Sequence, residues 1–98
     1  GDTPRMRVLQ YLIEGRAFDY TLTDLLNANV SWGTLNTLLP KLLKLGIVIK
    51  TRKIGRATLY KINKDNFVVK QLIALYESLI LGKLDEIENR EKEIVVKN

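Results

Sequence analysis

Apolar residues recur at spacings of three and four along the first part of the chain, a period that predicts amphipathic helices. The first helix is predicted over residues 4–14, because Thr3 can cap it, Pro4 suits its first position and Gly15 can end it. Its apolar residues are Met6, Val8, Leu9, Leu12 and Ile13. Its solvated polar face is expected to hold Arg5, Arg7 and Gln10.

A short loop and a second helix follow. Residues 16–20 are mixed in character, and Phe18 is expected to be the buried anchor of this loop. The second helix is predicted to begin near Thr21 or Leu22, where the hydroxyl of Thr21 or Thr23 can cap it, and to end around residues 27–29. Asn on both sides of Ala28 is typical of a turn, because Asn tolerates the left-handed backbone conformation. The buried face of this helix is expected to hold Leu22, Leu25 and Leu26.

A third helix is predicted over residues 32–45, with Ser31 as its N-cap and Gly46 as its stop. Its buried side is expected to hold Leu35, Leu38, Leu39, Leu42 and Leu45. Two helices joined by about three or four residues fit a helix-turn-helix. Pro40 has no N–H to offer the carbonyl of Asn36 and crowds that turn, so we expect a bend in the middle of this helix, or a helix that ends early and restarts.

After residue 46 the apolar residues recur at every second position, a period that predicts two β-strands. Residues 47–53 alternate apolar and polar side chains, and residues 57–62 do the same. The turn between them is expected at residues 54–56, where Gly55 can adopt the positive φ of a tight hairpin. The tip of this hairpin is therefore predicted to be basic and exposed.

A long helix is predicted from about Phe67, after a turn-and-cap cluster at residues 63–66. One apolar stripe along it contains Val68, Leu72, Leu75 and Leu79. A second stripe, with spacings close to a heptad seam, contains Val69, Ile73, Tyr76, Ile80, Leu84 and Ile87. A helix that is apolar over so wide an arc needs more burial than one side of a small domain offers. Gly82 is expected to kink this helix or to end it.

Composition and charge narrow the possible functions. The 98 residues, 46% of them hydrophobic, suffice for one small domain with its own core. Residues 1–64 carry eleven Lys/Arg against four Asp/Glu, a net charge of +7, whereas residues 65–98 carry five against seven, a net charge of −2. Between Lys41 and Lys64 there are eight basic residues and no acidic one. Such a density of positive charge is typical of a surface that binds a polyanion.

The chain contains no Cys and no His, which removes thiol nucleophiles, disulfides, imidazole bases and the usual zinc and copper ligand sets. Nothing pairs carboxylates, or a nucleophile with a base, at a recognisable spacing, so neither an enzyme nor a metal or other cofactor is expected. No apolar run approaches the ~20 residues needed to span a bilayer. A cytoplasmic, nucleoid-associated protein without a membrane partner is the expectation.

The order of three helices, a basic hairpin and a long helix resembles the winged helix-turn-helix transcription regulators over roughly residues 4–80. Residues 31–35 (SWGTL), the leucines that follow them and residues 45–48 (LGIV) are similar to the recognition-helix pattern of PadR-like and related small bacterial and archaeal regulators. Residues 55–60 (GRATLY) look like the wing and its returning strand. The resemblance implies an α+β, mainly α fold. A winged helix-turn-helix domain of three helices and a two-stranded wing would cover residues 3–64, and a C-terminal dimerisation helix would cover residues 65–96.

The resemblance further implies a regulator that binds double-stranded DNA with its third helix in the major groove. The candidate contacts on this helix are Ser31, Trp32, Thr34, Asn36, Thr37 and Lys41. Asn36 is the candidate for direct readout, because a carboxamide can pair with adenine N6 and N7 at once; the alternative is a solvated polar residue. Trp32 has the alternative of a partly buried packing role. Gly33 is expected to permit close approach either of the backbone to DNA or of the second helix to the third.

The wing would contact phosphates or the adjacent minor groove through Lys50, Arg52, Lys53 and Arg56. The second stripe of the long helix, Val69, Ile73, Tyr76, Ile80, Leu84 and Ile87, would meet its symmetry mate in a homodimer. Alternatively, this helix folds back to cover its own core through Leu72 and Leu75. Two other functions stay open: a winged-helix module that binds proteins, and a sequence-neutral chromatin or plasmid-partition protein that coats DNA.

Overall fold

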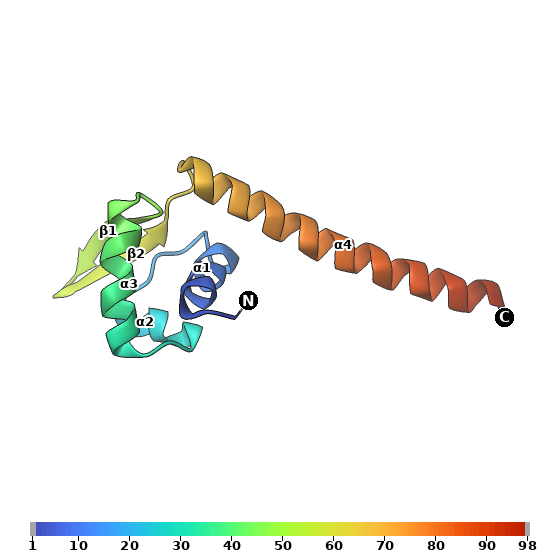
Figure 1. The fold of residues 1–98 in the computed structure, drawn as a ribbon, viewed down its shortest axis with the longest axis horizontal. Helices are drawn as coiled ribbons and strands as arrows, with labels where there is room; N and C mark the ends of the chain where they lie inside the picture. Colours follow the sequence, from blue (N-terminus) through green and yellow to red (C-terminus); the bar gives the residue numbers. More distant parts are fainter. Residues whose placement is uncertain (1, 98) are drawn as a thin grey trace.

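The computed structural model describes residues 2–97, without the side chains of residues 83 and 93–97. The order of elements is α1 (Pro4–Glu14), α2 (Leu22–Leu25), the 3-10 turn η1 (Leu26–Ala28), α3 (Trp32–Lys44), β1 (Val48–Ile54), β2 (Ala57–Ile62) and α4 (Phe67–Lys97). Figure 1 shows the first three helices and the hairpin gathered at one end of the molecule, with α4 extending away from them. The principal-axis extents of 61 × 27 × 26 Å reflect this projection.

Helix α1 begins and ends where the sequence predicts. Thr3 caps it, since its Oγ1 accepts a hydrogen bond of 3.2 Å from the backbone N–H of Met6. The residues that it buries are Val8, Leu9, Leu12 and Ile13. Met6, expected among them, is exposed, because it lies at the rim of the groove between α1 and α4. Arg7, expected to be solvated, instead donates to the carbonyl oxygen of Asn29 at 3.1 Å and so ties α1 to the turn before α3.

The loop between α1 and α2 is anchored by Tyr20, and the prediction that Phe18 anchors it is wrong. Phe18 is 66% exposed, because it lies in a turn closed by Gly15 before the chain reaches the sheet. Tyr20 pairs with Tyr60 of β2 through two backbone hydrogen bonds of 2.7 Å. Its ring lies 5.1 Å from that of Tyr11, and its hydroxyl donates to the carbonyl oxygen of Gly15 at 2.9 Å.

Helix α2 starts with a reciprocal cap, in which Thr21 is the N-cap of the two hydroxyl residues that the sequence offered. The hydroxyl oxygen of Thr21 accepts from the backbone N–H of Asp24 at 3.1 Å, and the Asp24 carboxylate accepts from the backbone N–H of Thr21 at 3.0 Å. The helix continues into η1 and ends at Asn29, which has a φ of 62°. This confirms the predicted turn, whose left-handed residue is an Asn.

Helix α3 runs without interruption through Pro40, so the alternative in which it ends early and restarts is wrong. Pro40 lies on the exposed side of the helix, where water can reach the carbonyl of Asn36 that has lost its partner. On the opposite side the helix is held by four buried residues, Leu35, Leu38, Leu39 and Leu42. Leu45, expected in the core, is exposed because the helix ends just before it and the chain turns at Gly46, whose φ is 71°.

Strands β1 and β2 form an antiparallel hairpin with Gly55 and Arg56 as its two-residue turn. Gly55 has a φ of 61°, which confirms its predicted role. The register shifts between Lys50 and Arg52, so Thr51 is an extra residue in a β-bulge that the sequence does not indicate. The buried residues of the hairpin are Val48, Leu59, Tyr60 and Ile62. All six residues of β1 after Val48 are exposed, so the outer part of the hairpin stands clear of the core.

Helix α4 begins at the predicted position. Asn66 caps it, since its Oδ1 accepts from the backbone N–H groups of Val68 at 2.8 Å and Val69 at 3.2 Å. The amide group of Asn66 also donates to the carbonyl oxygens at the end of α3, which joins the two helices. The helix continues through Gly82 to Lys97, so the expectation that Gly82 ends it is wrong. A single helical Gly costs only about 1 kcal/mol relative to Ala, which good helix formers on both sides can offset.

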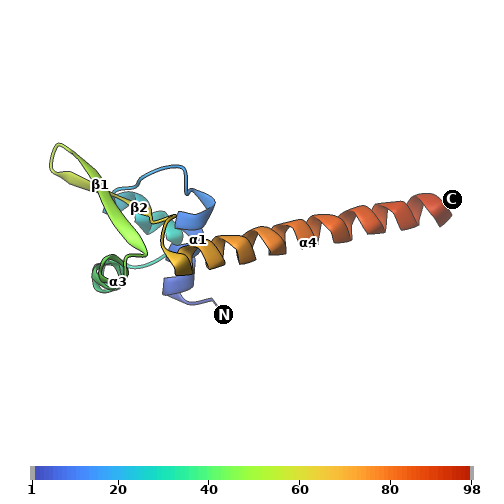
Figure 2. The same ribbon diagram turned by 90° about the horizontal axis from the view of Figure 1, so that it is seen from above.

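In the part of the chain that the structure describes, the first three turns of α4 pack against the core, and Leu79 and Ile80 of the next turn line the groove between α1 and α4. Val69 is fully buried in the core, and Leu72, Ile73 and Tyr76 pack partly against it. Two polar contacts fix the same region to the end of α1: Glu77 accepts from Arg16 at 2.8 Å, and the Tyr76 hydroxyl donates to Glu14 at 3.1 Å. Leu75, expected to cover the core, is exposed. Figure 2 shows the rest of the helix projecting from the domain. Among residues 2–97, none of the helices is both long and apolar enough to cross a membrane.

Candidate nucleic-acid interface

The hydroxyl groups at the start of α3 bond within the helix itself. Ser31 is the N-cap: its Oγ accepts from the backbone N–H of Thr34 at 3.1 Å, and its O–H donates to the Thr34 hydroxyl at 2.8 Å. The Thr37 hydroxyl donates to the carbonyl oxygen of Gly33 at 3.1 Å. Three of the six residues predicted to contact DNA from this helix therefore have an internal partner already.

The other three predicted contacts of α3 lie open to solvent. Trp32 has half of its surface exposed, and Asn36 and Lys41 are exposed as well. Among the described residues, the side chains of Asn36 and Lys41 make no hydrogen bond, and Lys41 makes no ion pair. A carboxamide and an ammonium group are thus free for an external partner.

Gly33 lies on the exposed side of α3 and is not required by packing. A Cβ atom built at Gly33 would meet nothing within 4 Å. The alternative in which Gly33 allows α2 to approach α3 is therefore wrong. Gly33, Thr37 and Pro40 follow one another at helical spacing, so this side of the helix carries little side-chain bulk.

A cleft of about 620 Å³ separates the N-terminal end of α1 from α3. It is lined by Thr3, Pro4, Arg5, Gly33, Thr34, Thr37, Leu38 and Lys41. Arg5 and Lys41 thus contribute positive charge from two different helices to one cleft. Sequence reasoning missed Arg5, because a basic residue on the polar face of a helix gives no signal that another helix lies across from it.

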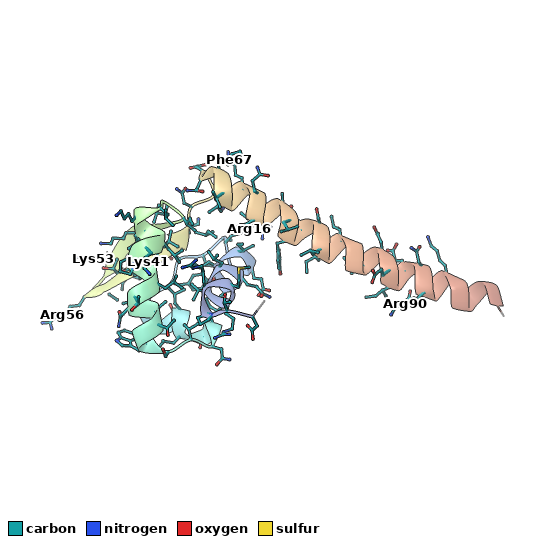
Figure 3. All side chains as sticks on the ribbon, in the orientation of Figure 1. Arg16, Lys41, Lys53, Arg56, Phe67 and Arg90 are labelled. Atoms are coloured by element: carbon teal, nitrogen blue, oxygen red, sulfur yellow. The ribbon has the colours of Figure 1, made fainter. Side chains whose placement is uncertain are left out.

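The wing presents three cations that have no partner among the described residues. Lys50, Lys53 and Arg56 are exposed and take part in no ion pair. Figure 3 shows Arg56 extending from the tip of the hairpin, away from the domain, and Lys53 and Lys41 at the same end of the molecule. From Leu25 to Lys64 the chain contains no acidic residue, so nothing in α3 or the hairpin neutralises these charges.

Arg52, the fourth residue predicted on the wing, does have a partner. Its Nε and Nη2 donate to the two carboxylate oxygens of Asp19 at 2.9 and 3.1 Å. The hydroxyl of Thr51 donates to the same carboxylate at 2.6 Å. The hydrogen bonds from Arg52 and Thr51 lower the pKa of Asp19 from 3.8 to about 2. We call Asp19, Thr51 and Arg52 the wing clamp.

The six residues predicted for dimerisation fall into three groups. Val69 is 0% exposed within its own domain, so its assignment to a dimer interface is wrong. Ile73 and Tyr76 are partly buried against the same core. Ile80, Leu84 and Ile87, beyond the turns of α4 that pack on the core, are 42%, 51% and 52% exposed, and Ile80 also lines the groove with α1. The stripe is continuous in sequence, and only the structure shows where the helix leaves the domain.

Comparison of the sequence with protein-family models gives no match, and comparison with curated proteins gives no significant one. Solved structures do resemble the chain. Rv0081 of Mycobacterium tuberculosis is 25% identical, with a TM-score of 0.60 over 88% of this chain and 82% of that one. NadR in complex with 4-hydroxyphenylacetate is 21% identical, with a TM-score of 0.67 over 98% of this chain and 69% of that one.

A third similar structure is described as the homodimeric winged helix-turn-helix DNA-binding domain of Mb0332 from Mycobacterium bovis, a possible ArsR-family transcriptional regulator. It is 21% identical, with a TM-score of 0.59 over 85% of this chain and 72% of that one. The helix-turn-helix of α2 and α3 and the β1–β2 wing occur in the same order as the sequence predicts. The chain therefore has the winged helix-turn-helix fold.

Proposed function

We propose that the protein is a transcription regulator that binds double-stranded DNA as a homodimer, with α3 in the major groove and the wing on the adjacent backbone. The observation that carries this proposal is the surface formed by α3 and the hairpin, which holds unpartnered cations and no carboxylate. The major groove, about 12 Å wide, admits an α-helix, and cations beside it attract phosphates without regard to sequence.

The cations lie on both sides of α3, which suits a helix held in a groove between two phosphate backbones. Lys41 and Arg5 line the cleft on the α1 side of this helix. Lys50, Lys53 and Arg56 belong to the hairpin that follows it. Phosphate contacts on both flanks would fix the depth and register of α3, while base edges would be read from its exposed side.

Base readout would rest on few residues. Asn36 supplies the exposed carboxamide, and Gly33 leaves room for the backbone of the first turn to come close to the DNA. The hydroxyls of Ser31, Thr34 and Thr37 are already bonded within the helix. This shortage of free base-reading groups favours a second candidate function, a DNA-coating protein with little preference among sequences.

Dimerisation is proposed through the projecting part of α4. Ile80, Leu84 and Ile87 recur at heptad spacing and remain exposed. The similar domain of Mb0332 is described as homodimeric, which supports a dimer here. A two-fold dimer would present two recognition helices to half-sites about 34 to 36 Å apart.

The proposal is tested by fluorescence anisotropy of the full chain with two duplexes, the DNA flanking its own gene and an unrelated fragment, over a range of salt concentrations. Tight binding to both duplexes that falls steeply with salt is expected, with a preference for the flanking DNA if the protein regulates its own gene. Equal affinities would identify a coating protein. An absence of binding at low salt would contradict the DNA proposal and favour a protein-binding module.

A double variant, Lys41→Ala with Arg56→Ala, removes one cation from α3 and one from the wing tip. Each phosphate contact contributes about 0.9 to the slope of log K against log salt, so this slope should fall by about 1.8 on both duplexes. The matched control is Arg90→Ala with Lys92→Ala, which removes the same charge from two exposed positions on α4. Figure 3 shows Arg90 far from the domain. If the control lowers the slope as much as the double variant, net charge and not this surface drives binding.

A further inference from the structure

The wing clamp joins three segments midway along the hairpin, at the β-bulge. The N–H and C=O of Tyr60 both bond to Tyr20, so the loop before α2 lies along the edge of β2 that faces away from β1. Asp19, the residue before Tyr20, nevertheless bonds to Thr51 and Arg52 of β1. Its carboxylate therefore reaches across β2 to β1, and together with the Tyr20–Tyr60 backbone pair it ties the loop to both strands.

We propose that this clamp fixes the direction of the wing relative to α3, and that Arg52 promotes DNA binding by positioning the wing and not by contacting a phosphate. The inference rests on the proposed DNA-binding function. It assigns Asp19, an acidic residue in a loop outside the basic surface, a role in binding a polyanion.

The geometry of the clamp supports a lasting contact. Arg52 meets Asp19 with two parallel hydrogen bonds, the arrangement that gives Arg–carboxylate pairs their directional specificity. The Asp19 side chain is only 16% exposed, although that of Arg52 is 61% exposed. The low pKa of Asp19 keeps this carboxylate ionised at every pH at which DNA binding would be measured. Two donors of Arg52 are thus occupied before any phosphate approaches.

The position of the clamp explains why the wing needs it. Thr51 is the extra residue of the bulge, where a strand bends and its twist increases. Beyond this point all residues of β1 are exposed, and on β2 Leu59 beside the bulge is the last buried residue, so little packing fixes the outer hairpin. A two-stranded hairpin alone is marginally stable in water. The clamp therefore holds the hairpin at the bulge, where its packing on the domain ends, and Lys53 and Arg56 lie beyond it.

The competing possibility is that Arg52 leaves Asp19 when DNA binds and contacts a phosphate. The two possibilities differ in the salt dependence of binding, because only a phosphate contact releases a counterion. They also differ in the effect of Asp19→Asn, which would loosen a positioning clamp but would free a withheld Arg52.

The test compares Asp19→Asn, Arg52→Gln, the double variant and Arg56→Gln by anisotropy on one duplex between 50 and 200 mM salt. We expect Asp19→Asn and Arg52→Gln each to weaken binding about threefold to tenfold with an unchanged salt slope, and the double variant to be no weaker than either. Arg56→Gln, the matched control, should lower the slope by about 0.9. The inference is overturned if Arg52→Gln lowers the slope as Arg56→Gln does, or if Asp19→Asn leaves the affinity unchanged or raises it.

Hydrogen exchange of the full chain without DNA tests the clamp independently of the DNA proposal. The backbone amides of residues 52–59 should exchange faster in Asp19→Asn and Arg52→Gln than in the wild type or in Arg56→Gln. Because Arg52 is mostly exposed, its pair with Asp19 should contribute little to global stability, and circular dichroism should show all variants folded. Unchanged exchange would overturn the clamp. If the wild type binds no DNA while exchange changes as expected, the proposed function fails and the clamp stands as a structural device.

Discussion

Replacing Gly33 by Ala separates what the fold requires of α3 from what DNA requires of it. Gly33 lies in the first turn of the helix, and a Cβ atom there would meet nothing within 4 Å. Ala loses less conformational entropy than Gly on folding, which stabilises by about 0.4 to 1 kcal/mol when the native backbone accepts it. For a domain of this size, such a gain raises the Tm by about 2 to 8 °C.

The same methyl group should weaken DNA binding. If the backbone of the first turn approaches base edges or phosphates, an added Cβ either clashes or pushes the helix outwards. Overpacking of a well-fitted contact costs about 1 to 3 kcal/mol, which corresponds to a loss of about fivefold to more than a hundredfold in affinity. Gly33→Ala should therefore be more stable than the wild type and bind DNA less well.

Thermal unfolding followed by circular dichroism and anisotropy with one duplex measure the two effects on the same preparation. Gly82→Ala is the matched control, because a Cβ atom at Gly82 also meets nothing within 4 Å, but Gly82 lies on α4, on the side of the helix away from Ile80. This control should gain stability and keep its affinity. A destabilised Gly33→Ala would refute the open space assigned to Gly33, and a stabilised variant with wild-type affinity would refute a close approach of this turn to DNA.

Three further predictions concern other parts of the molecule. Leu84→Glu should convert a dimer into a monomer in sedimentation at micromolar concentration, because it buries a charge in the proposed seam; a variant that still dimerises would show that the seam lies elsewhere. Arg5→Ala should lower the salt slope of binding by about 0.9 on any duplex, and an unchanged slope would remove the α1 side of the cleft from the interface. The pKa of Asp19 lies near 2, below its ordinary value of 3.8, so the stability contributed by this carboxylate is complete above about pH 4 and is lost as the pH falls through 2. An NMR titration of the carboxyl carbon checks this, and a midpoint near 3.8 would mean that the clamp is not formed in solution.

Local features of the fold could be predicted because their causes are local. The caps at Thr3, Ser31 and Asn66 each accept hydrogen bonds from backbone N–H groups two or three residues further on. The hairpin turn required positive φ at Gly55, which Gly adopts without strain. Such signals lie within a few residues in the sequence. They therefore suffice to locate the helices and strands, and to assign the basic surface to the hairpin.

Features that depend on distant partners could not be predicted. Tyr20 replaced Phe18 as the loop anchor because its backbone pairs with Tyr60, forty positions away in the sequence. Asp19 and Arg52 are separated by 33 positions, so nothing local to the wing indicates that one of its cations is partnered. Pro40 and Gly82 each disfavour a helix locally, but α3 and α4 continue through them because the neighbouring residues of each helix offset this free-energy cost.

The stretch of α4 beyond the domain separates positive from negative charge along the molecule, which gives the molecule an electric dipole. The molecule is 61 Å along its longest axis. Residues 1–64 carry a net charge of +7, and residues 65–98 carry a net charge of −2. Charges in physiological salt act over a Debye length of about 8 Å, so the two ends of such an axis feel a polyanion separately. If the protein binds DNA as proposed, a nearby duplex would attract the domain and weakly repel the helix, which would turn the wing and α3 towards the duplex before contact. The acidic helix would thus orient the protein during its approach and reduce the number of encounters that begin in an unproductive orientation.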